Sequence, residues 1–175
     1  MRGQTVHRTP TYDLESVQPM RDELVAVGFE DLRTAQGIDK AVGETTGSVL
    51  VMINSVCGCA AGSARPGVAM ALQHHVIPDR LITVFAGMEH DAVERVRALH
   101  AGYPPSSPSL VLLRDGKLIA MLERRMIEEK TAEQIAADLV QLFTRHCSRP
   151  GPSIPAREFA KLEFAQVCGT SIPRY

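Results

Sequence analysis

Apolar residues recur at helical spacing near the start of the chain, after a polar stretch without periodicity. Val17, Met20, Leu24 and Val27 are three or four positions apart, which places them on one face of a helix. Gly28 follows the last of them, and glycine is a residue type that often ends helices. The pattern therefore predicts an amphipathic first helix.

Two further helices carry start signals. Thr34 is placed to cap a short helix over residues 35–42, because its side-chain oxygen can accept a hydrogen bond from the first turn. Thr131 and Gln134 have the spacing of a capping box, and apolar residues continue from there at helical spacing to about Cys147. We expect this last helix to close the core.

The longest run of branched apolar residues is SVLVMIN at residues 48–54, which suits a strand covered on both faces. A second short buried strand is predicted at residues 81–85. Helices predicted at residues 60–73 and 91–100 alternate with these strands, and such alternation predicts parallel neighbours joined by a right-handed crossover. Pro66 lies inside the first of the two helices and predicts a kink there.

The second half of the predicted sheet is a hairpin. Residues 109–114 form one strand, Asp115-Gly116 is a turn signal, and residues 117–123 form the returning strand. Parallel and antiparallel neighbours together predict an α/β fold with a central mixed sheet of about four strands.

Three regions are expected along the chain: an N-terminal tail at residues 1–15, one domain at residues 16–147, and a C-terminal extension at residues 148–175. The extension begins with the proline-rich stretch SRPGPSIP, which indicates a linker. A short amphipathic segment follows, with apolar residues at Phe159, Leu162 and Val167.

Composition narrows the class of protein. A chain of 175 residues with 45% hydrophobic residues is long enough to bury a core, and a net charge of -1 with interspersed charges offers nucleic acid or anionic lipid no attraction. The first twenty residues lack the apolar stretch of a signal peptide, and no segment is long enough to span a bilayer. We therefore expect a cytoplasmic protein without nucleic-acid or membrane partners.

Four cysteines are too few for a disulfide-built scaffold, yet Cys57 and Cys59 are separated only by Gly58. The pair follows the buried strand and precedes a helix, where unpaired backbone N–H groups and the helix dipole favour negative charge. Such a position typically lowers a thiol pKa from about 8.5 into a range of about 3.5 to 7.5. Cys57, at the junction, is therefore the expected nucleophile.

Cys59 is close enough to attack a mixed disulfide formed on Cys57, which makes it the candidate resolving thiol. One intervening residue leaves a small ring, so an internal disulfide should be strained and easily reduced. Gly58 either permits backbone angles that other residues resist or keeps the approach to sulfur open. The sequence does not separate these two reasons.

The cysteine pair would also suit a soft-metal site or a redox sensor. Two thiolates would hold zinc or copper for delivery, but zinc needs about four ligands and no second pair stands at the usual spacing. His74 and His75 are adjacent and would point in different directions on a helix, so we expect them to be solvated. A sensor would oxidise and then bind a partner through the C-terminal extension.

Three sequence blocks point to a family. NSVCGCAAGSARP, TVFAGMEHDA and YPPSSPSLVLL resemble the corresponding blocks of the bacilliredoxins, which are thioredoxin-like proteins of bacteria that use bacillithiol. The similarity runs from about Val17 to Cys147, and several motifs in one order are far more specific than a lone Cys-X-Cys. The resemblance implies a thioredoxin-like, three-layer α/β/α fold.

The resemblance also implies an activity, the removal of bacillithiol from S-thiolated protein substrates. Cys57 would attack the mixed disulfide and carry the small thiol away, with Cys59 as the resolving residue and without a bound cofactor or metal. A general disulfide reductase or isomerase activity would be compatible. Beside the cysteines, the resemblance implies as site neighbours Asn54, Ser55, Gly58, Gly62, Arg65, Pro66, Ser107 and Pro108.

Thioredoxin-like folds place an X-Pro bond, usually cis, just before the third core strand and beside the reactive cysteines. Ser107-Pro108 fits that place. Cys147 matches a C-terminal His-Cys pair of the family and Cys168 lies outside the similarity; for both we prefer the interpretation of an idle thiol over that of a redox partner. Arg124 and Arg125 could guide an anionic thiol substrate, although paired charges after a strand more often form a solvated edge.

Overall fold

Strand β2 (Ser48–Asn54) is the middle strand of the sheet in the computed structural model, which describes residues 8–164. All seven of its residues are buried, as the apolar run predicted. It pairs in parallel with β4 (Arg80–Phe85) and antiparallel with β5 (Ser109–Arg114). The mixed sheet predicted from the sequence is therefore confirmed.

The sheet has five strands in the order β1-β4-β2-β5-β6. Strand β6 (Lys117–Leu122) returns from β5 through Asp115 and Gly116, whose φ angles of 49° and 75° are those of a tight hairpin turn. The extra strand is β1 (Glu30–Asp31), which pairs with β4 at the edge. Two residues are too few to show a sequence period, so the prediction of about four strands missed it.

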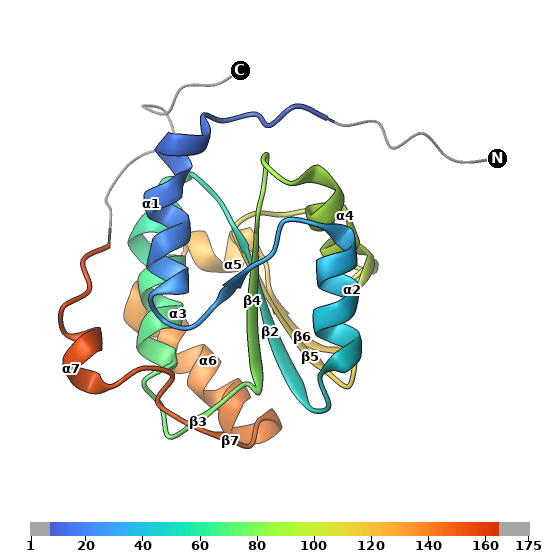
Figure 1. Ribbon diagram of the computed structural model, residues 1–175. Coiled ribbons are helices and arrows are strands. Elements are labelled where there is room, and N and C mark those ends of the chain that lie inside the picture. The colour runs from blue at the N-terminus through green and yellow to red at the C-terminus, as the bar shows by residue number, and fades with distance from the viewer. Residues whose placement is uncertain (1–7, 165–175) are drawn as a thin grey trace.

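Helices cover both faces of the sheet (Figure 1). On one face lie α1 (Leu14–Val25), α3 (Arg65–Ala71) and α6 (Ala132–His146); on the other lie α2 (Ala35–Glu44) and α4 (His90–Ala98). The core is divided accordingly into one apolar cluster on each side of β2. These layers confirm the predicted three-layer α/β/α arrangement.

The predicted helix caps are present. Thr34 Oγ1 accepts the Gly37 N–H at 3.0 Å, and Thr131 and Gln134 form the reciprocal capping box at the start of α6. Helix α2 extends to Glu44, two residues beyond the predicted end. Helix α5 (Arg124–Glu128) was not predicted, because its five residues are too short to show an apolar period.

The helix after the cysteine motif is interrupted where Pro66 was expected to kink it. A π-helical turn, η1 (Ala60–Ala64), comes first, and the Arg65 N–H donates to the Ala60 carbonyl five residues back. Pro66 then lies in the first turn of α3, directly after the π-helical turn, where proline has no N–H to donate. The interruption therefore takes the form of a change of helix type.

The beginning of the C-terminal extension is bound to the rest of the chain, although its prolines suggested a linker. Strand β7 (Arg149–Pro150) pairs with β3 (Val76–Ile77), and the Ser153 N–H donates to the Leu72 carbonyl at 2.9 Å. Helix α7 (Ala156–Phe159) follows, and Phe159 and Leu162 pack against the core. Val167 lies outside the described residues.

Within residues 8–164, the structure contains no helix long and apolar enough to cross a membrane.

Candidate functional site

Cys57 and Cys59 lie just beyond the C-terminal end of β2 and form a disulfide with Cα atoms 5.4 Å apart. Both cysteines are half-buried, and Gly58 between them is exposed. Val56 is buried in a small cluster with Met20 and Phe85, so the chain is anchored immediately before the first sulfur. The motif is thus held in place and open to solvent on one side.

The first sulfur accepts a hydrogen bond from the start of the following helix. The Ala60 N–H points at Cys57 Sγ at 3.4 Å, and the Cys57 carbonyl accepts the Ala60 and Ala61 N–H groups at 3.0 and 3.2 Å. Backbone N–H groups at a helix start favour negative charge on a nearby atom. This geometry favours the thiolate form of Cys57 when the disulfide is reduced.

Gly58 is not required by the backbone conformation. Its φ angle lies outside the left-handed region, and a Cβ added at this position would meet no atom within 4 Å outside the two flanking cysteines. Of the two reasons weighed from the sequence, the geometry therefore favours an open approach to the sulfurs.

Arg65 holds the loop that carries Cys57. Its side chain is completely buried, and Nη1 donates to the Ser55 carbonyl at 3.0 Å and to Asn54 Oδ1 at 3.2 Å. Its Nε forms an ion pair with Glu23 of α1. Burial lowers the pKa of the Arg65 guanidinium, and the neighbouring charge of Glu23 opposes that shift. A buried cation with these partners fixes the path of residues 54–55 relative to α1.

Asn54 provides a second tie between the loop and α1. Its side-chain amide donates to the Met20 carbonyl at 3.0 Å, and its oxygen accepts the Ser55 N–H at 2.8 Å. The Ser55 hydroxyl in turn accepts the Cys57 N–H at 3.3 Å. Asn54, Ser55 and Arg65, which the sequence placed near the site, are therefore brought together beneath Cys57.

Pro108 approaches the same end of the sheet from the neighbouring strand. The Ser107-Pro108 peptide bond is cis, as is usual for the X-Pro bond at this place in thioredoxin-like folds, and Pro108 is buried. Ser109 pairs with Ile53 of β2, so Ser107 and Pro108 lie beside the end of β2 that leads into Cys57.

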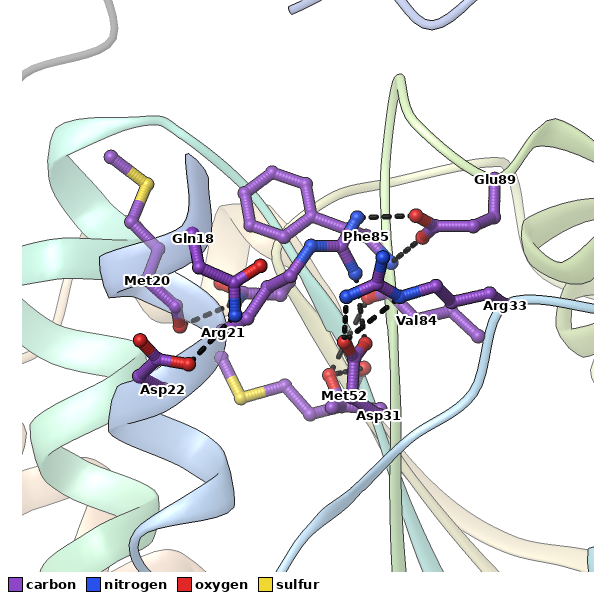
Figure 2. A network of polar contacts seen from close by, with 12 residues as sticks. Gln18, Met20, Arg21, Asp22, Asp31, Arg33, Met52, Val84, Phe85 and Glu89 are labelled. Atoms are coloured by element: carbon purple, nitrogen blue, oxygen red, sulfur yellow. Dashed lines mark hydrogen bonds and ion pairs between the residues drawn. The ribbon is translucent and has the colours of Figure 1, made fainter. Parts of the chain in front are cut away.

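A second buried arginine, Arg21, was missed in the sequence (Figure 2). Arg21 is 2% exposed; it donates to Asp31 at 2.8 Å, forms an ion pair with Glu89, and lies 5.0 Å from the centre of the Phe85 ring. Glu89 also accepts the Phe85 N–H at 3.2 Å. The network ties α1 to the neighbouring strand ends and to the start of α4. The sequence gives one sign of this network: Arg21 lies next to Met20 on the apolar face of the first helix, where a charged residue needs buried partners.

Cys147 lies away from the motif, at the other end of β2. Its thiol is half-buried near Ser48, the first residue of β2, while Cys57 follows the last. A seven-residue strand spans about 20 Å at roughly 3.3 Å per residue, so the two thiols are far apart. Burial raises the pKa of the Cys147 thiol, and the charge of Asp79 adds to that effect. Cys168 lies outside the described residues.

His74 and His75 lie beyond the end of α3 rather than on a helix, and their rings are neighbours, so the prediction that they point in different directions is wrong. His74 contacts Thr144 Oγ1 at 3.1 Å, and its ring lies 4.1 Å from that of His75. In the part of the chain that the structure describes, no three His, Cys, Asp or Glu residues gather closely enough to hold a metal ion.

The sequence is similar to that of known proteins along most of its length. The family described as disulphide isomerase matches residues 12–147. A bacilliredoxin of Koribacter versatilis is 51% identical over 129 residues, covering 74% of this chain and 89% of its own length. Bacilliredoxins of Salinibacter ruber and Staphylococcus aureus are each 47% identical, over 156 and 131 residues, covering 81% and 75% of this chain and 91% and 90% of their own lengths.

A solved structure that concerns the thiol resolving mechanism in yeast mitochondrial 1-Cys peroxiredoxin has a TM-score of 0.50 and 15% identity, covering 67% of this chain and 95% of that chain. At this identity the likeness concerns the fold alone. Together with the order of the sheet, it confirms the predicted thioredoxin-like fold.

From its bacilliredoxin relatives and its thioredoxin-like fold, the protein is a thiol-disulfide oxidoreductase. With a match over residues 12–147 and relatives at 47–51% identity along most of both chains, this chain belongs to the bacilliredoxin family.

Proposed function

We propose that the protein removes bacillithiol from S-thiolated proteins, with Cys57 as nucleophile and Cys59 as resolving thiol. The observation that carries the proposal is the Ala60 N–H directed at Cys57 Sγ, 3.4 Å away, at the start of a helix. The half-exposure of Cys57 and its disulfide partner two residues along support the same roles.

The chemistry requires two exchanges. The Cys57 thiolate attacks the bacillithiol sulfur, a new S–S bond forms, and the substrate cysteine leaves as a thiolate that takes a proton from solvent. Cys59 then loses its proton and attacks Cys57 Sγ, which releases bacillithiol and closes the Cys57–Cys59 disulfide. The dithiol loses two electrons and the mixed disulfide gains them. Two molecules of a low-molecular-weight thiol, which leave as their disulfide, or one dithiol reductase return two electrons for the next cycle.

Asn54, Ser55 and Arg65 act in this proposal as positioning residues. Their hydrogen bonds fix the backbone that places Cys57 Sγ against the helix start. A reductase that consumes thiols in this way fits the cytoplasm, where small thiols and reductases keep cysteines reduced. We therefore retain the cytoplasm as the proposed compartment.

The test uses a reporter protein that carries a bacillithiol mixed disulfide. Wild type and Cys59→Ala should release bacillithiol from the reporter, whereas Cys57→Ala should not. Mass spectrometry should find bacillithiol retained on Cys57 in Cys59→Ala. Cys147→Ala serves as the matched cysteine control and should behave as wild type. Equal release by all four proteins would contradict the assigned roles.

Disulfide isomerisation is the second candidate, favoured by the description of the family that matches residues 12–147. An isomerase needs the nucleophile but not net reduction. Cys59→Ala would then rearrange a scrambled disulfide substrate as fast as wild type, and wild type would leave the bacillithiol reporter intact.

Metal analysis of anaerobically purified protein distinguishes these two redox activities from metal delivery, which requires stoichiometric zinc or copper.

A further inference from the structure

An open groove lies between the loop before β5 and the start of α5. Its volume is about 560 Å³, and its walls include Tyr103, Ser106, Glu123, Arg124 and Arg125. The proposed cysteine chemistry does not use any of these side chains. The groove is therefore free to serve a separate role.

The groove opens at the same end of the sheet as the cysteines. Ser109 of β5 pairs with Ile53 of β2, and Leu122 of β6 pairs with Leu110 of β5. Since strands are about 4.8 Å apart, the end of β6 lies about 10 Å across the sheet from the end of β2. Helix α5 also contacts η1, the turn that follows the cysteines. A small molecule bonded to Cys57 can therefore extend to the groove.

Two arginines give the groove its hydrogen-bond donors. Arg125 Nε donates to Glu123 at 2.8 Å, and Arg124 Nε pairs with Glu128. Among the described residues, neither guanidinium has a further hydrogen bond from its Nη groups. The Arg125 side chain is 81% exposed, whereas Glu123 is 5% exposed, so a buried carboxylate anchors a guanidinium that projects into solvent.

Ser106 stands in the wall of the same groove with its hydroxyl buried. Ser106 Oγ is shielded from solvent and has no hydrogen-bond partner within the described part of the chain. It lines the same groove as the two arginines. The remaining N–H groups of the two guanidinium groups match a carboxylate, which can accept two parallel hydrogen bonds from a guanidinium.

We propose that this groove binds the carboxylate groups of the small-thiol half of the mixed disulfide. The inference rests on the proposed function, because it assumes that the small thiol becomes bonded to Cys57. Arg124 and Arg125 then select a carboxylate-bearing thiol over a neutral one. The acidic partners Glu123 and Glu128 reduce the net positive charge of the groove.

The test compares thiols of different charge on one reporter protein. Mixed disulfides are prepared with mercaptosuccinate, which carries two carboxylates, with neutral 2-mercaptoethanol, and with cationic cysteamine. The single-turnover rate of thiol release is measured for each. Wild type should release mercaptosuccinate about tenfold faster than 2-mercaptoethanol, and cysteamine more slowly than either.

Variants are compared by the ratio of the mercaptosuccinate rate to the 2-mercaptoethanol rate. The double change Arg124→Gln with Arg125→Gln should bring this ratio close to one. Glu128→Gln should raise it two- to threefold, because it removes a negative charge from the groove wall. Arg145→Gln removes an exposed positive charge on α6 and should leave the ratio as in wild type.

A general loss of folding lowers both rates and cancels in the ratio. A wild-type ratio near one, or a ratio that survives in the double variant, would overturn the groove assignment while release itself still supports the proposed function. Failure of wild type to release any of the three thiols would instead reject the proposed function, and the groove assignment with it.

Discussion

Cys57 and Cys147 stand at opposite ends of β2 and at opposite ends of helices. Cys57 precedes η1, and its sulfur accepts the Ala60 N–H; Cys147 follows the last residue of α6, where carbonyls lack partners within the helix. The last of them, the His146 carbonyl, accepts a hydrogen bond from Arg114 Nη1 at 3.3 Å. The partial charge is positive at a helix start and negative at a helix end, so the thiolate is favoured in the first place and disfavoured in the second. The two cysteines, at opposite ends of one strand, thus lie in electrostatic environments of opposite sign.

Desolvation adds to the effect at Cys147. The Cys147 thiol packs against the core, and burial raises its pKa; Ser48 and Arg114 counter that shift only in part. Cys57 is half-buried like Cys147, so exposure alone does not separate the two thiols. The comparison indicates that position relative to a helix, rather than the presence of a cysteine, identifies the reactive thiol in this fold.

The largest effect is expected from Arg65, which supports the Cys57 end. Arg65→Met should destabilise the protein by about 3–5 kcal/mol, because it leaves Glu23 buried without its charged partner. Urea denaturation measures the change. Arg65→Lys keeps the charge but cannot reproduce the fork to Ser55 and Asn54, so alkylation of Cys57 should slow at least threefold while that of Cys147 stays the same. Equal slowing of both thiols would mean that Arg65 acts on stability alone.

Removal of residues 148–175 should affect the opposite end. Four half-buried apolar side chains are then lost from the core. The free energy of unfolding should fall by about 3 kcal/mol, if each contributes about half of what a fully buried apolar side chain contributes. These side chains are Ile154, Phe159, Leu162 and Phe164. Thermal unfolding should shift downward and alkylation of Cys147 should accelerate, with reductase activity per folded molecule retained at low temperature. Loss of activity in the folded truncated protein would support the redox-sensor hypothesis instead.

Gly58→Ala should separate access from stability at the Cys57 end. The new Cβ meets no atom outside the two flanking cysteines, and the φ angle lies outside the left-handed region, so the free energy of unfolding should change by less than about 0.5 kcal/mol. Reaction with a protein mixed disulfide should slow about fivefold, because the methyl group stands beside the sulfurs. Gly43→Ala, in α2 and equally unobstructed, is the matched control and should leave the rate unchanged. An unaffected rate in Gly58→Ala would refute the role of access.

The smallest effect is a pH dependence of stability from His100. Burial lowers the pKa of His100, so the unfolded chain binds its proton at a higher pH than the folded chain. Stability should therefore fall as pH drops below about 6.5, by less than about 1.4 kcal/mol per pH unit. His100→Phe should flatten this part of a stability profile measured by denaturant. A profile identical to that of wild type would assign the dependence to other groups.

Local patterns were enough to predict the elements that build the site. The apolar run at residues 48–54, the turn at Asp115-Gly116 and the Thr131 capping box each depend on neighbours in sequence, and each was confirmed. The Cys-Gly-Cys motif could be placed between a strand and a helix for the same reason. The local sequence pattern was therefore enough to place Cys57 at the junction of a strand and a helix.

Long-range partners could not be predicted in this way. Arg21 meets Asp31 and Glu89, and the latter is 68 residues away. Likewise β3 and β7 have only two residues each and pair only because α6 brings them together. The groove beside α5 is formed by a loop and by the residues that follow a strand, so the groove could not be predicted from either segment alone.

Alkylation of the two thiols across a pH series is the most direct test of the contrast between the ends of β2. Reduced Cys59→Ala protein is treated with iodoacetamide, and the peptides carrying Cys57 and Cys147 are quantified by mass. At pH 7, Cys57 should react about a hundredfold faster than Cys147, as expected if the pKa of the Cys57 thiol is lower by about two units or more. Equal rates, or a faster Cys147, would contradict the account.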